Sequence, residues 1–272
     1  MSEDLAGSGA GASLDPERER MQDPGHLENG LDGASPWYRW GPYLAERAWG
    51  SVREDYSADG DAWASFPHDH ARSRAYRWNE DGLAGYSDLR NQVNLGLALW
   101  NGNDPILKER IFGLTNGQGN HGEDAKEYWW YLDAVPSSAW LRWRYHYPQA
   151  AYPYQDLIEE NARRGKDQPE YELLDTGIFD EDRYFVVEVH YAKADPDDTL
   201  MRVLVTNMGP DAAELDVLPT LWCRNTWSWH PASPRPELRA DGDGRIKVSH
   251  PALGEYELVV GAGPDGRQPE LL

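Results

Sequence analysis

Residues 199–222 read TLMRVLVTNMGPDAAELDVLPTLW, and this stretch decides the class of fold. Apolar residues alternate with polar ones on both sides of a turn-forming sequence at 208–211, which is the period of two of a half-buried strand. The apolar positions expected on one shared face are Met201, Val203, Val205, Leu215 and Val217. The stretch therefore predicts a β-hairpin that buries one face.

Short runs of this kind, bounded by Gly, Pro, Asn and Asp, recur along the chain, and most contain β-branched or aromatic residues. One amphipathic helix is expected at 154–164, with Leu157 and Ile158 facing inward. We therefore predict a mainly β protein built from antiparallel sheet. The strands expected besides 199–207 and 213–222 are 82–88, 93–100, 108–113, 128–134, 139–147, 184–193, 245–250 and 255–260.

Composition narrows the classes of partner. The 272 residues carry a formal net charge of -21, which would repel a nucleic-acid backbone or an anionic lipid surface. The 13 Trp and 15 Tyr far outnumber the 4 Phe, so most of the rings have a polar group suited to a partly wet site. A neutral ligand is the partner expected from this balance.

The single cysteine, Cys223, excludes an intrachain disulfide framework and favours a reducing compartment. We expect it to be a small buried hydrophobe rather than a nucleophile. No apolar run has the length of a membrane span, and the start MSEDLAGSGAG is acidic where a signal peptide would be basic and then apolar. The sequence predicts a soluble, cytoplasmic protein.

The two ends of the chain differ in character. Residues 1–36 are rich in Gly, Ala, Asp and Glu, so they are expected to form a disordered tail. Residues 37–272 are expected to form one β-sandwich domain. The chain stops at Leu272 directly after a strand-and-turn pattern, which indicates a truncated domain end.

Residues 37–78 interleave Trp, Tyr, His, Arg and carboxylates with few aliphatic residues. Aromatic faces beside paired hydrogen-bonding groups suit a sugar, whose C–H face stacks on a ring while its hydroxyls need bidentate partners. This segment therefore predicts a carbohydrate-binding surface.

The loop at 116–124, NGQGNHGED, also brings polar groups together, because its glycines let the backbone bend. It has no Lys-Ser or Lys-Thr pair, and its two carboxylates would repel a phosphate. An ordinary long hairpin loop is the alternative to a binding loop here.

Two other motifs resemble metal sites and are interpreted otherwise. His68 and His70 have the H-x-H spacing of a zinc site, but Arg72 occupies the next alternate position where an acid is required. The sequence DGDG at 241–244 lacks the later ligands of a calcium loop and predicts a hairpin turn. No metal or other cofactor is expected.

Trp227 and Trp229 would share one face if the strand that ends near Trp222 continued, and they would then form a stacking platform for a sugar. Tryptophans at this spacing are as often part of the core between two sheets. Both interpretations stay open from the sequence.

Several blocks of the chain together resemble bacterial glucosidases of glycoside hydrolase family 63, relatives of the processing α-glucosidase I and of the mannosylglycerate hydrolases. The resemblance extends from Trp37 to the end of the chain. Its blocks are WGPYLAERAWG at 40–50, VREDYS at 52–57, PHDHARSRAYRW at 67–78, FGLTN at 112–116, NHGED at 120–124, YELLDTG at 171–177 and RNTWSW at 224–229.

The resemblance implies an amino-terminal super-β-sandwich followed by an (α/α)6 barrel that carries the acid and base of an inverting α-glycosidase. No series of long amphipathic helices is present, so the barrel is expected to be absent from this chain. The adjacent pairs Glu123–Asp124 and Glu54–Asp55 are not assigned as its replacement, because neighbouring residues on an extended chain point apart. No catalytic residue is therefore assigned.

The sequence thus predicts the non-catalytic sandwich of an inverting α-glycosidase, with an α-linked glucoside and the catalytic barrel of the same protein as its partners. A free-standing carbohydrate-binding domain is the alternative, and tryptophans left bare at a domain interface are a third possibility. The residues expected to line the substrate pocket are Trp40, Tyr43, Glu46, Arg47, Asp61, His68, Asp69, His70, Asn120, His121, Glu123, Asp124, Trp227 and Trp229.

Overall fold

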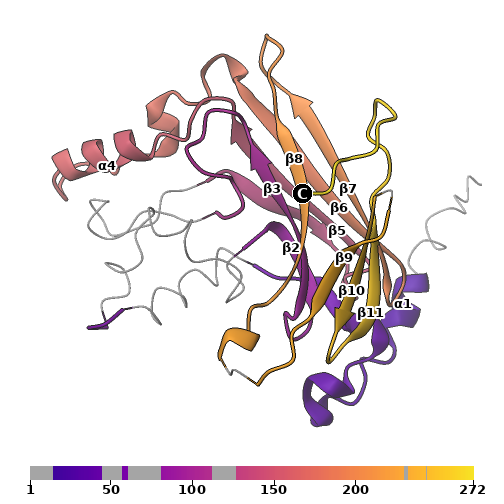
Figure 1. Cartoon of the computed structure of the whole chain (residues 1–272). Coiled ribbons are helices and arrows are strands. Elements are labelled where there is room, and N and C mark those ends of the chain that lie inside the picture. The colour runs from indigo at the N-terminus through magenta and orange to yellow at the C-terminus, as the bar shows by residue number, and fades with distance from the viewer. Residues whose placement is uncertain (1–14, 45–56, 61–80, 112–126, 230–231, 243) are drawn as a thin grey trace, which may run out of the picture.

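The computed structural model confirms a mainly β protein with antiparallel sheets (Figure 1). It describes residues 15–44, 57–60, 81–111, 127–229, 232–242 and 244–272. Within these residues the strands form two four-stranded sheets and one three-stranded sheet. The two larger sheets pack face to face as a β-sandwich, and the small sheet lies beside them.

The first sheet has the strand order β1-β2-β3-β8 and the second has β4-β5-β6-β7. The strands of the first are β1 (Trp40–Pro42), β2 (Leu83–Asp88), β3 (Val93–Trp100) and β8 (Asp216–Cys223). Those of the second are β4 (Trp129–Ala134), β5 (Trp140–Pro148), β6 (Tyr184–Asp195) and β7 (Asp198–Asn207).

The core lies between the inner faces of these two sheets. Strand β6 shows why its sequence forms a central strand, since buried residues alternate with partly buried ones along it. Phe185, Val187 and Val189 are at most 2% exposed and pack with Leu97 and Leu99 of β3. Complete burial of a side chain of this size stabilises the folded state by about 1.5–3 kcal/mol.

The hairpin expected at 199–222 is wrong in its pairing. Strand β7 follows β6 after a tight turn between Asp195 and Asp198 and pairs with it. Strand β8 instead crosses to the other sheet, where its whole length pairs with β3. The shorter connection lets β6 and β7 pair locally, and the longer one after β7 reaches the other sheet. The expected apolar face is confirmed for Met201, Val203, Leu215 and Val217, which pack on the core, while Val205 is exposed.

The small sheet has the order β11-β10-β9. Its strands are β9 (Glu237–Ala240), β10 (Arg245–His250) and β11 (Gly254–Val259). The expected hairpin is confirmed to the extent that β9 and β10 pair on either side of residues 241–244, of which residue 243 lies outside the described ranges. Strand β9 was not expected, because its residues are all exposed and give no alternating pattern. A strand at 108–113 was expected, but Lys108 makes one isolated bridge to Leu99 and residues 112–113 lie outside the described ranges.

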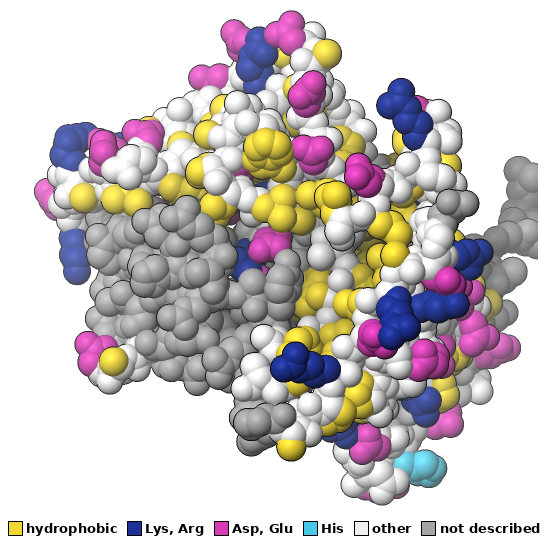
Figure 2. All heavy atoms as spheres, viewed as in Figure 1, with side chains coloured by type: hydrophobic (Ala, Val, Ile, Leu, Met, Phe, Trp, Pro, Cys, Tyr) yellow, Lys and Arg dark blue, Asp and Glu magenta, His cyan; other side chains and the backbone are white. Residues whose placement is uncertain are grey.

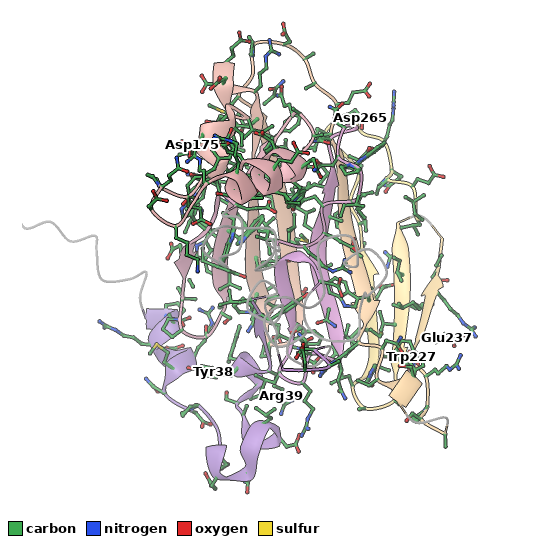
Figure 3. The ribbon with its side chains drawn as sticks, turned by 90° about the vertical axis from the view of Figure 1, so that its left-hand side faces the viewer. Tyr38, Arg39, Asp175, Trp227, Glu237 and Asp265 are labelled. Carbon is green, nitrogen blue, oxygen red and sulfur yellow. The ribbon has the colours of Figure 1, made fainter. Side chains whose placement is uncertain are left out.

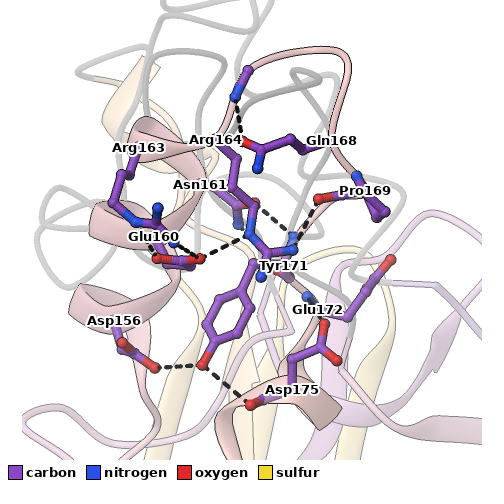
Figure 4. A network of polar contacts seen from close by, with 11 residues as sticks. Asp156, Glu160, Asn161, Arg163, Arg164, Gln168, Pro169, Tyr171, Glu172 and Asp175 are labelled. Carbon is purple, nitrogen blue, oxygen red and sulfur yellow. Dashed lines mark hydrogen bonds and ion pairs between the residues drawn. The ribbon is translucent and has the colours of Figure 1, made fainter.

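The expected helix is confirmed as α4 (Tyr154–Arg163), which buries Leu157. The short helices η5 (Leu173–Thr176) and η6 (Asp180–Asp182) follow it. Asn161 joins α4 to the chain that returns beside it, since its side chain donates to the carbonyl of Tyr171 (3.0 Å) and accepts from the Tyr171 N–H (2.8 Å) (Figure 4). The Tyr171 hydroxyl donates to Asp156 at 3.1 Å.

The amino-terminal region differs from the disordered tail expected through residue 36. Its described part contains α1 (Asp15–Met21), η1 (Leu27–Gly33) and η2 (Pro36–Tyr38). The physical reason is that its polar side chains find partners both on the sandwich and within the region itself. Glu17 accepts hydrogen bonds from the backbone N–H and the hydroxyl of Ser137, and Arg20 lies 4.6 Å from the Trp37 ring centre. Residues 1–14 lie outside the described ranges.

Across the described ranges, every helix is too short or too polar to cross a membrane.

Candidate functional site

Among the candidate residues that the structure describes, Trp40 lies beside a cavity. It begins the edge strand β1, which pairs with β2. Its indole Nε1–H donates to Asp197 Oδ1 at 3.1 Å. Its ring stacks on Tyr86 with centroids 6.3 Å apart and meets the edge of Tyr256 at 5.3 Å. Trp40 therefore joins the first sheet, the tip of the β6–β7 hairpin and the small sheet.

Two neighbouring cavities share Trp40, Asp197 and Tyr256 as lining residues, and we call them together the Trp40 cleft. The first has a volume of about 140 Å³ and lies between the sandwich and the small sheet. In Figure 2 hydrophobic side chains gather in a hollow between these two parts. The second, of about 340 Å³, extends to Asp32, Arg39, Asp88 and Arg90. The remaining residues lining the first cavity are Tyr86, Val93, Asn94, Leu95, Asp198, Thr199, Leu221, Val248, Glu257 and Leu258.

The wall of the Trp40 cleft is fixed by contacts within the core. Tyr86 is 3% exposed, stacks on Tyr191 with centroids 4.8 Å apart, and shares a hydrogen bond of 3.0 Å with the Thr199 hydroxyl. Burial raises the pKa of Tyr86, and the Asp197 carboxylate adds to the rise while the Thr199 hydrogen bond opposes it. The phenol therefore stays a neutral hydrogen-bonding group at physiological pH.

This arrangement suits a neutral polyhydroxylated ligand. Aromatic rings offer faces and edges for C–H groups, and the carboxylates of Asp197 and Asp198 accept hydrogen bonds from hydroxyls. Arg39 in the second cavity adds a donor. Among the described residues, no three metal-ligating side chains gather in one group.

Tyr43, also expected in the pocket, has a packing role. Its ring lies on Gly85, where an added Cβ would come within 2.3 Å of it. Its hydroxyl donates to the backbone carbonyl of Asp81 at 2.5 Å. Any side chain at position 85 would displace this ring, so the glycine of β2 is needed to seat Tyr43.

The stacking platform of Trp227 and Trp229, one of the two interpretations left open by the sequence, required the strand near Trp222 to continue, and that strand does not continue. Strand β8 ends at Cys223, and residues 227–229 form the short helix η7 instead. Trp227 is partly buried against the small cluster of Val93, Cys223 and Val248, which is the core interpretation left open by the sequence. In Figure 3 it lies at the same end of the sandwich as Tyr38 and Arg39, opposite Asp175.

Cys223 itself is buried, and burial raises the pKa of its thiol to about 11. A thiol with this pKa is a poor nucleophile at neutral pH, which agrees with the expected role of a small hydrophobe.

Ten of the expected pocket residues lie outside the described ranges, and these are Glu46, Arg47, Asp61, His68, Asp69, His70, Asn120, His121, Glu123 and Asp124. The structure does describe residues that flank the segments 61–80 and 112–126. Those flanking residues form a buried charge cluster of Asp81, Lys108, Arg110 and Glu127, each at most 9% exposed.

The buried charge cluster contains two ion pairs. Arg110 pairs with Asp81, and Lys108 Nζ lies 2.9 Å from Glu127 Oε1. The Tyr145 and Tyr154 hydroxyls also donate to the Glu127 carboxylate. The buried carboxylate thus has an ammonium and two phenols around it, which offsets part of its desolvation.

Burial is the first cause of the raised pKa of Tyr145, Tyr152 and Tyr154, and the Glu127 charge is the second. Lys108 Nζ also lies 4.4 Å from the centre of the Tyr152 ring, a cation–π distance. The three tyrosines therefore remain protonated, and the hydroxyls of Tyr145 and Tyr154 donate to the carboxylate of the ion pair.

The cluster also joins described residues that flank the two different segments. Asp81 directly follows segment 61–80, and its partner Arg110 comes just before segment 112–126. The N–H of Gly82 donates to the carbonyl of Glu109 at 2.7 Å. The described residues that follow position 80 and those that precede position 112 are therefore held together at one place.

Sequence reasoning missed Tyr86, Asp197 and Tyr256 as site residues. Tyr86 and Tyr256 lie in strands that were expected, but nothing in a period of two shows that two sheets meet at those rings. Asp197 lies in a short turn that has an ordinary turn composition. Only the packing of the small sheet against the sandwich reveals the site.

A comparison with known proteins finds a relative in yeast. Over 244 residues the chain is 43% identical to the uncharacterized protein YMR196W of Saccharomyces cerevisiae, a match that covers 85% of this chain and 22% of the yeast protein. The chain therefore spans about a fifth of the length of the curated relative it matches. No protein-family model matches the chain. No solved structure matches it either.

Proposed function

We propose that this chain is the amino-terminal β-sandwich part of an inverting α-glycosidase of the glycoside hydrolase family 63 type. Its role is to bind an α-linked sugar and to shape the substrate pocket, while a helical barrel of the same full-length protein carries the acid and base. We place the protein in the cytoplasm, with no nucleic-acid or membrane partner. The barrel supplies the two carboxylates that such a reaction needs.

The observation that supports this proposal most directly is the Trp40 cleft. Trp40 belongs to the first block of the resemblance, at 40–50, and it lines both cavities with Tyr256 and Asp197. A pair of rings beside a carboxylate suits a sugar, whose C–H face packs on a ring and whose hydroxyls donate to a carboxylate. The mainly β fold agrees with the expected sandwich.

The length of the yeast relative gives a second argument. The matched region is 22% of that protein, so most of its length is available for further domains. A division of labour between a sandwich and a catalytic barrel is compatible with that proportion. Aromatic rings and carboxylates of the present chain would then act in substrate binding, not in bond cleavage.

Hydrolysis tests the division of labour. We expect the purified 272-residue chain to leave p-nitrophenyl α-glucoside intact. The full-length yeast relative, assayed in parallel on aryl α-glucosides and α-linked disaccharides, is expected to release glucose with inversion, followed by NMR of the fresh product. Hydrolysis by the chain alone that persists through further purification would contradict the proposal.

A free-standing carbohydrate-binding domain is the second candidate, because the Trp40 cleft could bind a sugar without any barrel. It predicts oligosaccharide binding by this chain and no glycosidase activity in the full-length relative. The two candidates therefore share the binding experiment and differ in the hydrolysis experiment.

A further inference from the structure

Strand β6 contains a buried lysine in a place where its pattern calls for a hydrophobe. The inward positions of the strand are Phe185, Val187, Val189 and Tyr191, and the next is Lys193, which is 6% exposed. A buried ammonium loses its hydration and needs polar partners to offset that loss. What Lys193 contacts therefore indicates what it is for.

The ammonium of Lys193 is surrounded by backbone carbonyls. Its Nζ donates to the carbonyl of Trp37 at 2.7 Å, to that of Trp40 at 2.6 Å and to that of Ser137 at 3.0 Å. An ammonium has three N–H donors, so these three acceptors use all of them. Lys193 thereby ties three segments of the chain together at the start of β1.

The charged groups nearest to Lys193 come from other elements. Glu17 and Arg20 of α1 and Asp197 of the β6–β7 turn act on it, with Glu17 and Asp197 favouring its charge and Arg20 opposing it. Burial is the largest influence and lowers the pKa of Lys193 to about 8. The side chain is therefore still charged at neutral pH, with all its donors present.

The β6–β7 hairpin holds Trp40 at two points. Lys193 binds its backbone carbonyl at 2.6 Å, and Asp197, four residues later, binds its indole N–H at 3.1 Å. The first contact fixes the position of the Trp40 backbone, and the second fixes the orientation of its ring. Lys193 and Asp197 both belong to the β6–β7 hairpin, so a single element of the fold positions this binding group.

We propose that Lys193 is a positioning residue of the Trp40 cleft, which holds the Trp40 main chain so that its ring stands correctly for an α-linked gluco-oligosaccharide. Lys193 itself does not contact the ligand. This inference rests on the proposed function for its ligand, but its effect on Trp40 can be measured without one.

The first measurement follows the Trp40 ring directly. The protein is labelled with 5-fluorotryptophan, and the Trp40 signal in the fluorine NMR spectrum is assigned with Trp40→Phe. In Lys193→Met, which keeps the aliphatic stem and loses the three donors, we expect the Trp40 signal to shift or broaden. Lys247→Met, which removes an exposed lysine paired with Asp241, is the matched control and is expected to leave that signal in place.

The second measurement is the affinity for maltotriose by titration calorimetry, which we expect to fall about tenfold in Lys193→Met and to be unchanged in Lys247→Met. Glu188→Gln, which removes the carboxylate paired with Arg142 and Arg144 and is expected to lower the stability of the same sheet, separates positioning from general loss of stability. If Lys193→Met does not fold, Lys193→Gln replaces it, because an amide retains two N–H donors.

The outcomes are distinct. An unmoved Trp40 signal, or an affinity loss as large in Glu188→Gln as in Lys193→Met, would overturn the positioning role. A shifted signal with unchanged maltotriose affinity would also overturn it. If the wild-type protein does not bind maltotriose while the Trp40 signal does move, the contact between Lys193 and Trp40 stands and the proposed function fails.

Discussion

Removing Lys108 tests the buried charge cluster most sharply. Lys108→Met keeps a side chain of similar length but removes the ammonium that lies 2.9 Å from Glu127. The Glu127 side chain is 0% exposed, so water cannot replace the lost partner without local opening. The carboxylate would remain in the interior with only phenol hydroxyls around it.

Breaking one side of a buried ion pair costs about 3–5 kcal/mol. Because Tyr145 and Tyr154 still donate to Glu127, we expect the lower end of that range, about 3 kcal/mol in the free energy of unfolding. For a chain of this size that loss corresponds to a melting temperature lower by about 6–12 °C. The double variant Lys108→Met with Glu127→Gln removes the stranded charge and should be more stable than Lys108→Met alone.

Urea unfolding followed by circular dichroism gives the free energies for the wild type, both single variants and the double variant. Lys247→Met is the control, since its ion pair with Asp241 is exposed and should change stability by less than about 0.5 kcal/mol. A loss under about 1 kcal/mol in Lys108→Met would refute the reasoning. Equally, additive losses in the double variant would show that the two residues are not coupled.

Three further outcomes are expected. Asn161→Ala removes both hydrogen bonds to the Tyr171 backbone and should cost about 1–3 kcal/mol in urea unfolding. The Arg144 hydrogen bonds are the main cause that lowers the pKa of Glu188 to about 2. The ionised carboxylate therefore contributes to the free energy of unfolding above pH 4.5, and this contribution is lost as the pH falls toward 2. Glu188→Gln should therefore cost about 1–2 kcal/mol at pH 7 and almost nothing near pH 2, a difference that urea titrations at several pH values would measure. Gly85→Ala should displace the Tyr43 ring and lower the melting temperature, whereas an unchanged melting temperature would contradict the close contact.

Most strands of this fold could be predicted from the sequence, because a period of two records which side of a strand is buried. The pattern does not record which strand lies alongside. The run from Leu215 to Trp222 has the correct buried face but pairs with β3 in the opposite sheet, not with β7. Which strands pair depends on the lengths of the β6–β7 and β7–β8 connections, and an alternating pattern of apolar residues does not show which of the two connections joins paired strands.

The site was less predictable for a related reason. Trp40 was expected from its aromatic and polar surroundings in sequence, yet its partners Tyr86, Asp197 and Tyr256 come from three distant segments. Lys193 could have been noticed, since it follows four inward-facing hydrophobic positions at the same spacing. Its three carbonyl partners could not, because backbone acceptors leave no trace in a sequence.

The central claim is that the Trp40 cleft binds an α-linked sugar, and titration calorimetry of the whole chain with maltotriose tests it most directly. Wild type and Asp265→Ala, which changes an exposed turn, should bind with the same affinity. Asp197→Ala, which removes a lining carboxylate of both cavities and the partner of the Trp40 indole, should bind at least about tenfold more weakly. The absence of binding heat in the wild type, or equal affinity in Asp197→Ala, would contradict the claim.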